Sequence, residues 1–91
     1  MGEEPSLEEL RDEVREATLG MIRLAGRRLE LARRIGEIKR KRGLPVEDPE
    51  VEGELRRLVL EECRARGVDG RLGLRLLDLL IDESKRVQGG R

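Results

Sequence analysis

The sequence predicts an all-α protein with three helices per chain, one long and two shorter, that forms an interlocked homodimer. Apolar residues recur in alternating steps of three and four from Leu7 to Ile38, which is typical of a helix packed against other helices. Glycine-containing breaks divide the rest of the chain into two segments of helical length, and no stretch alternates like a strand. The first helix is longer than the other two can cover, so a second copy of the chain is expected.

The long helix is expected over about residues 6–42. Ser6 can cap its amino end, and Glu9, three residues later, completes a capping box. Gly43 ends the helix after a run of basic residues, and Pro45 cannot continue it. At 1.5 Å per residue this helix extends roughly 55 Å, against about 28 to 30 Å for each later helix.

The apolar stripe of the long helix contains one cation, Arg28. Its remaining positions are all apolar: Leu7, Leu10, Val14, Ala17, Met21, Leu24, Leu31, Ile35 and Ile38. A buried guanidinium without a partner is strongly unfavourable. An anion, which could be a ligand, should therefore lie beside Arg28.

The second and third helices are expected over about residues 49–66 and 70–88. Asp48 precedes a proline, which suits an N-cap followed by the first helical position, and Gly67 follows the second segment. Asp69 then opens the third helix.

Residues 1–91 are interpreted as a single domain. Its core has to be built without Phe, Tyr or Trp, and a domain of this size buries a modest share of its surface, so oligomerisation would help. The uncovered part of the long helix should meet an antiparallel copy across a two-fold axis. Close approach of the two long helices would account for Gly20 and Gly26 within them.

Composition favours a cytoplasmic protein that does not bind nucleic acid or membranes. Lys and Arg together number 20, as do Asp and Glu, so the formal net charge is zero. No apolar run has the length of a membrane span. The single Cys63 is expected to be a small core residue rather than half of a disulfide. With no His and no evident metal-binding cluster, neither a metal nor another cofactor is expected.

Two cations of the long helix lie on one line. Arg28 and Lys39 are eleven residues apart, or three turns, and their long side chains could close around a small anion of carboxylate type. Arg11 lies roughly 25 Å from Arg28 along the axis and about 100° around it. Arg11 could therefore share a small ligand with Arg28 only from the partner subunit of an antiparallel dimer.

Polar pairs at one end of each shorter helix could face this cationic line. Asp48 and Glu52 open the second helix four residues apart, and Ser84 and Gln88 close the third with the same spacing. Such a pocket could bind and orient an anion, but it pairs no nucleophile with a base. An enzyme with this site would work by positioning and electrostatic stabilisation.

Each of these polar residues also has a purely structural interpretation. Arg28 could extend to solvent or pair with a glutamate of the second helix. In the same way Lys39 could be a solvated helix end, Asp48 a simple N-cap and Glu52 a surface charge. Ser84 and Gln88 could belong to a fraying last turn.

The chain resembles the all-helical chorismate mutases over about residues 7–88. The resemblance includes the helix lengths, the connection Gly43-Leu44-Pro45-Val46-Glu47-Asp48, and the segment Leu29-Glu30-Leu31-Ala32-Arg33-Arg34-Ile35-Gly36-Glu37-Ile38-Lys39. The functional pattern of the family is matched at Arg11, Arg28, Lys39, Asp48, Glu52, Ser84 and Gln88. This resemblance implies an interlocked dimer with two active sites, each containing Arg11 from the opposite subunit.

The implied reaction is the rearrangement of chorismate to prephenate, a shikimate-pathway step toward phenylalanine and tyrosine that needs no cofactor. By resemblance, four residues are catalytic: Arg28 holds a carboxylate together with Arg11 of the partner subunit, Lys39 and Gln88 donate to the ether oxygen, and Glu52 accepts the ring hydroxyl. The resemblance further implies that Asp48 marks a helix start that assists Glu52, and that Ser84 assists a carboxylate.

One position departs from the pattern of the family. The family commonly has arginine just before the glutamate, and this chain has Val51. A lost charged hydrogen bond costs roughly 1.5 to 3 kcal/mol, unless Arg27 or Arg56 substitutes for the missing cation. We expect a higher Michaelis constant than in a Val51→Arg variant.

Three different functions compete with a mutase. An isochorismate pyruvate lyase would share the scaffold, and a non-catalytic helical dimer could regulate an aromatic-pathway synthase. Nucleic-acid binding through the basic run 39–42 is disfavoured by the zero net charge and by the lack of aromatic stacking residues.

Overall fold

The computed structural model describes residue 2 and residues 4–89, which form three α-helices and no strand. The helices are α1 (Leu7–Arg42), α2 (Pro49–Arg66) and α3 (Gly70–Gln88). The all-α prediction is confirmed for these residues. Residues 1, 3, 90 and 91 of the expected domain lie outside the described part of the chain.

Local capping sets both ends of α1. The Ser6 hydroxyl accepts the amide of Glu9 at 3.1 Å and donates to the carboxylate of Glu9 at 3.3 Å. At the other end Gly43 has φ 65°, a left-handed conformation that favours glycine, and the Leu44 amide reaches the Lys39 carbonyl at 2.8 Å. The helix therefore begins and ends where short-range chemistry dictates.

The two shorter helices begin differently. The Asp69 carboxylate caps α3 by accepting the Arg71 amide at 2.8 Å. Hydrogen bonds from the Arg71 side chain and from that amide lower the pKa of Asp69. Asp48 occupies the N-cap position of α2, but its side chain makes no capping hydrogen bond. The prediction that α2 begins after Asp48 is therefore confirmed, whereas capping by the Asp48 side chain is not observed.

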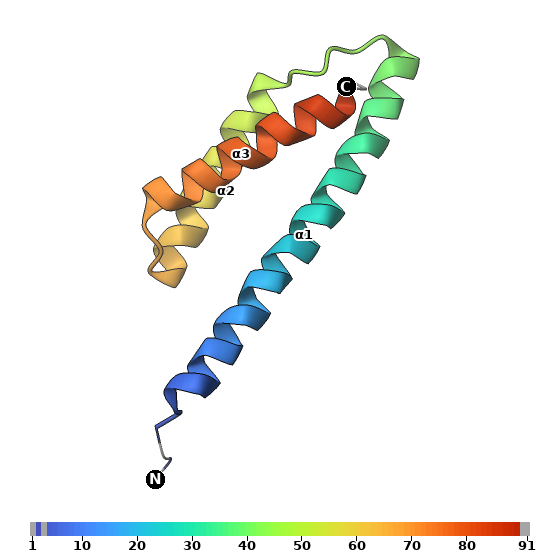
Figure 1. Cartoon of the computed structure of the whole chain (residues 1–91). Coiled ribbons are helices and arrows are strands. Elements are labelled where there is room, and N and C mark those ends of the chain that lie inside the picture. The colour runs from blue at the N-terminus through green and yellow to red at the C-terminus, as the bar shows by residue number, and fades with distance from the viewer. Residues whose placement is uncertain (1, 3, 90–91) are drawn as a thin grey trace.

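Helix α3 packs against both neighbouring helices (Figure 1). Its carboxyl end lies beside the carboxyl-terminal half of α1, and α2 runs along its other side. The amino-terminal half of α1 extends away from this group, giving the molecule an extent of 60 × 23 × 18 Å. The carboxyl-terminal half of α1 and the two shorter helices thus form the packed part of the chain.

Small residues bring α3 close to its neighbours. A Cβ on Gly36 of α1 would lie 2.8 Å from the Cα of Gln88, and one on Gly73 of α3 would overlap the sulfur of Cys63. Cys63 is buried, as expected for a small core residue. The buried face of α3 also includes the apolar residues Leu77 and Ile81.

The apolar stripe of α1 is largely uncovered within one chain. Its large apolar members retain between 45% and 68% of their surface: Leu7, Leu10, Val14, Met21, Leu24, Leu31, Ile35 and Ile38. A Cβ on Gly20 or Gly26 would meet nothing within 4 Å. The predicted homodimer stays a prediction, because the structure describes a single chain. None of the helices in the described residues combines the length and apolar character needed to cross a membrane.

Candidate active site

A cavity of about 370 Å³ lies between α1, the first turns of α2 and the last turns of α3. Its size is typical of small-molecule sites. Aliphatic side chains form one part of its wall: Leu31, Ile35, Val51, Leu55 and Ile81. Six of the seven predicted site residues also line it: Arg28, Lys39, Asp48, Glu52, Ser84 and Gln88. Residues far apart in the sequence are thus brought to one site.

The guanidinium of Arg28 points from α1 to α3. It donates to the hydroxyl of Ser84 and to the Leu80 carbonyl, the latter at 3.3 Å. Extension of Arg28 to solvent and its pairing with a glutamate of α2 are therefore both wrong. Both of these acceptors, the Ser84 hydroxyl and the Leu80 carbonyl, are neutral oxygens. No carboxylate of the described residues forms an ion pair with Arg28. Its positive charge remains available to an anion that enters the cavity.

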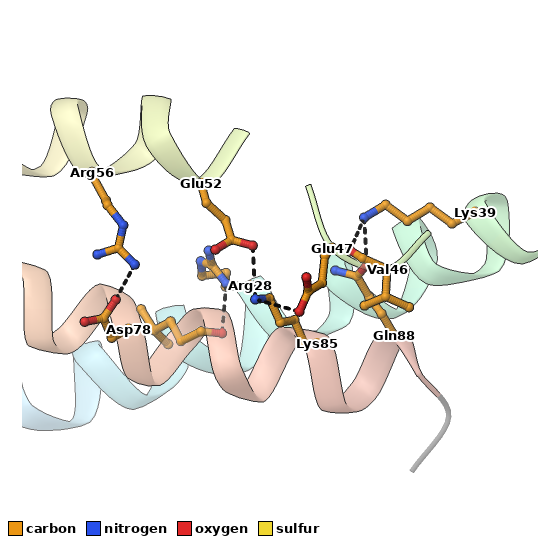
Figure 2. A network of polar contacts seen from close by, with 10 residues as sticks. Arg28, Lys39, Val46, Glu47, Glu52, Arg56, Asp78, Lys85 and Gln88 are labelled. Carbon is orange, nitrogen blue, oxygen red and sulfur yellow. Dashed lines mark hydrogen bonds and ion pairs between the residues drawn. The ribbon is translucent and has the colours of Figure 1, made fainter. Parts of the chain in front are cut away.

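Lys39 connects α1 to the end of α3. Its ammonium donates to the Val46 carbonyl at 2.8 Å and to the side-chain oxygen of Gln88 at 3.0 Å (Figure 2). The interpretation of Lys39 as a solvated helix end is therefore wrong. Because the amide oxygen of Gln88 accepts this bond, its NH₂ group is the part left to donate to a ligand.

The end of α3 is fixed from three directions. Gln88 is only 8% exposed, and its backbone carbonyl accepts a hydrogen bond from Arg40 at 2.7 Å. Gly36 leaves room for its backbone, and Lys39 holds its side chain. Ser84, one turn earlier, is 7% exposed. The interpretation of these two residues as a fraying last turn is therefore wrong.

Glu52 is held by a lysine that the sequence pattern did not single out. The Lys85 ammonium lies 3.2 Å from Oε2 of Glu52 and 3.6 Å from Oε1 of Glu47 (Figure 2). The side chain of Glu52 is 22% exposed, so it is not a simple surface charge. The hydrogen bond with Glu52 raises the pKa of Lys85. One signal could have found Lys85: it lies four residues after Ile81, on the side of α3 that faces the cavity.

The two residues at the start of α2 contribute different chemistry. Asp48 lines the cavity with a carboxylate that the helix does not use for capping. Val51 also lines the cavity and gives it an apolar wall at this point. Arg27 and Arg56 are not among the lining residues, and Arg56 pairs with Asp78 at 2.7 Å. Neither arginine supplies a cation beside Val51.

Arg11 is the one predicted site residue that lies elsewhere. It lines a separate surface hollow near the amino end of α1, together with Glu8, Asp12 and Arg15. One chain therefore does not bring Arg11 to Arg28, in agreement with the distance expected along a single helix.

The chemistry of the cavity suits binding of an anion. Its lining includes three cationic side chains, Arg28, Lys39 and Lys85, and two carboxylates, Asp48 and Glu52. The hydroxyl of Ser84 contacts a guanidinium and not a general base. These groups can hold and orient a charged molecule and stabilise negative charge that develops within it.

Comparison with known proteins identifies relatives over nearly the whole chain. Residues 10–89 match the family described as chorismate mutase type II. A chorismate mutase of Methanocaldococcus jannaschii is 30% identical over 82 residues, which cover 90% of this chain and 83% of that protein. The family match includes Arg11 and every residue that lines the cavity.

Proposed function

This chain belongs to the chorismate mutase type II family and is an isomerase, and we propose that it converts chorismate to prephenate in the cavity between its three helices. The observation that carries the proposal is the convergence of Arg28, Lys39, Glu52 and Gln88 on one cavity. The reaction would serve the synthesis of phenylalanine and tyrosine in the cytoplasm. One carbon–oxygen bond breaks and one carbon–carbon bond forms within the same molecule, so no proton, electron or cofactor is exchanged.

The first task of the site is to hold a flexible dianion in a reactive shape. Arg28 has a charge that no described carboxylate neutralises, so it can bind one substrate carboxylate bidentately. Ser84, which already contacts Arg28, can donate its hydroxyl to the same group. Restricting chorismate to a chair-like conformation removes much of the entropy cost of reaching the transition state.

The second task is to stabilise the negative charge that grows on the ether oxygen. The Lys39 ammonium lies 3.0 Å from the side-chain oxygen of Gln88. The remaining N–H groups of both side chains can therefore donate to the same ether oxygen of the substrate. Donors aimed at charge that develops during bond breaking lower the barrier more than they tighten ground-state binding. Their attachment to each other and to neighbouring backbone reduces the reorganisation needed during the reaction.

Glu52 and Asp48 would recognise the ring hydroxyl. Glu52 is held by Lys85 at the cavity wall, and an ionised carboxylate is a strong acceptor for a hydroxyl donor. The first turn of α2 adjoins Asp48, and helix amino ends carry unpaired amide groups that can assist.

The complete site would be formed by a homodimer. The uncovered apolar side chains of α1 provide a surface that a second copy could bury, and Gly20 and Gly26 leave open space for close backbone approach. An antiparallel arrangement would bring Arg11 of the partner subunit to the cavity, where it could bind the second substrate carboxylate.

Turnover of chorismate tests the proposal directly. The absorbance of chorismate in the ultraviolet should fall in the presence of the protein, and Arg28→Ala should lower kcat/KM by at least about 100-fold, since a bidentate ion pair contains two charge-assisted hydrogen bonds. Lys39→Ala should lower kcat more than it changes KM, because Lys39 stabilises charge that develops only in the transition state. Lys41→Ala is the matched control, since Lys41 is exposed and lies outside the cavity.

Three outcomes would overturn the assignment. Pyruvate release from isochorismate without turnover of chorismate would indicate a lyase. A purified dimer that converts neither compound would indicate a regulatory module, for which an aromatic-pathway synthase is the expected partner. Full activity in the Lys39→Ala variant would place the reaction elsewhere in the molecule.

A further inference from the structure

Lys85 is a cavity cation that has no direct task in the proposed reaction beyond holding Glu52. It is one of three lysines in the chain, with Lys39 and Lys41, and it projects from the last turns of α3 into the cavity lining. Its side chain is 32% exposed, so the ammonium is partly shielded but still reachable by a ligand. Its hydrogen bond with Glu52 raises the pKa of Lys85, so this contact further favours the positively charged form.

Without Lys85, the positive charge around the cavity would not balance the two negative charges of the substrate. Apart from Lys85, the charged side chains that line the cavity are two cations, Arg28 and Lys39, and two carboxylates, Asp48 and Glu52, so their net charge is zero. Arg11 of the partner subunit would leave a single positive charge to meet a doubly negative substrate. Lys85 supplies the second positive charge, so that the occupied site becomes neutral.

Lys85 lines the same cavity as Val51, the position at which the family commonly has a cation. Glu52, which it contacts at 3.2 Å, directly follows Val51, and all three side chains line the same cavity. Lysine has three donors, and the bridge to Glu47 at 3.6 Å involves a carboxylate that is 73% exposed. An exposed ion pair of this kind is weak, so a substrate carboxylate can replace it.

We propose that Lys85 binds one carboxylate of the substrate, replacing the cation that is absent at Val51, and that Glu52 positions its ammonium for this contact. This inference rests on the proposed mutase function. It changes the expectation for Val51→Arg, because a chain that already has a cation at this wall gains little from a second one.

Kinetics of Lys85 variants test the contact. Lys85→Met keeps most of the side-chain volume and should lower kcat/KM by about 10- to 100-fold, mainly through a higher KM, because a carboxylate is bound in both ground and transition states. Lys85→Arg should retain most of the activity. Lys41→Met is the matched control and should leave both constants unchanged.

A rescue experiment separates binding from mere positioning of Glu52. Val51→Arg alone should change KM by less than about threefold, whereas Val51→Arg combined with Lys85→Met should recover at least about tenfold of the lost kcat/KM. A fall confined to kcat, or no recovery by Val51→Arg, would mean that Lys85 only holds Glu52, and the inference would be overturned.

Protection of lysines in the unaltered protein gives a readout that needs no variant. Acetylation followed by mass spectrometry, with and without prephenate, should show slower modification of Lys39 and Lys85 and an unchanged rate at Lys41. Equal modification of Lys85 with and without prephenate, in a protein that turns over chorismate, would overturn this inference alone. Absence of turnover in the unaltered protein would instead remove the proposed function.

Discussion

The two halves of α1 share one sequence pattern and have different surroundings. Both halves carry apolar residues in steps of three and four, yet among the described residues only the carboxyl-terminal half packs against α3. There the small residues Ala32 and Gly36 are buried against α3. In the amino-terminal half, Val14 and Leu24 keep 65% and 68% of their surface. Periodicity therefore indicates a helix with a buried face but not what covers that face.

The comparison also separates two kinds of site residue. Arg28, Lys39 and Arg40 lie in the covered half and reach α3 within one chain. Arg11 lies in the uncovered half, away from the cavity. If the uncovered half is a subunit interface, then half of α1 builds the site of its own chain and half completes the site of its partner.

The largest expected effect comes from mixing a variant in the amino-terminal half of α1 with a variant in its carboxyl-terminal half. Arg11→Ala and Arg28→Ala should each lower kcat/KM by at least about 100-fold, through loss of bidentate carboxylate binding. Mixing the two inactive variants after reversible unfolding should restore about a quarter of the unaltered activity, because half of the dimers are mixed and each has one intact site of two.

Each variant refolded alone is the control for that mixture. A mixture as inactive as its components, while sedimentation shows dimers, would mean that Arg11 does not act across the interface. Sedimentation showing only monomers in an active protein would remove the interface itself.

The covered half can be tested at the contact between Gly36 and Gln88. Gly36→Ala would place a methyl group 2.8 Å from the Gln88 Cα, and backbone has to move to relieve this overlap. We expect kcat to fall about 10- to 100-fold because Gln88 is displaced from the ether oxygen. Gly53→Ala is the matched control, since a Cβ there meets nothing within 4 Å. Equal kcat values in the two variants would show that the position of Gln88 tolerates movement.

The smallest expected effect concerns pH. Gln88 is neutral and donates at every relevant pH, and the raised pKa of Lys85 means that its positive charge is lost only as pH rises through that value. Turnover should therefore change by less than about threefold between pH 5 and 8. A steep decline across that interval, measured with a buffer series of constant ionic strength, would point to a titrating catalytic group.

The helix ends could be read from the sequence because their causes are local. Ser6, Gly43, Gly67 and Asp69 act within a few residues, and the structure places helix boundaries at each of them. The same applies to the line formed by Arg28 and Lys39, since spacing along one helix fixes it. Spacing could not show what these cations contact, because Ser84 and Gln88 lie more than forty residues away along the chain.

The parts of the site that escaped prediction depend on packing between helices. Lys85 lies four residues after Ile81, which indicates its side of α3, but its contact with Glu52 exists only because α2 and α3 run side by side. The anion expected beside Arg28 is replaced in the single chain by a hydroxyl and a carbonyl of α3. Spacing within one helix carries no information on either contact.

An unbroken helix runs from Arg11 to Lys39. In a two-fold assembly each of these rods would serve two pockets at once, with its ends roughly 40 Å apart. A substitution near Arg11 would then alter a pocket built mainly by the other polypeptide. Because both polypeptides have the same sequence, any mutation of this helix would change both pockets.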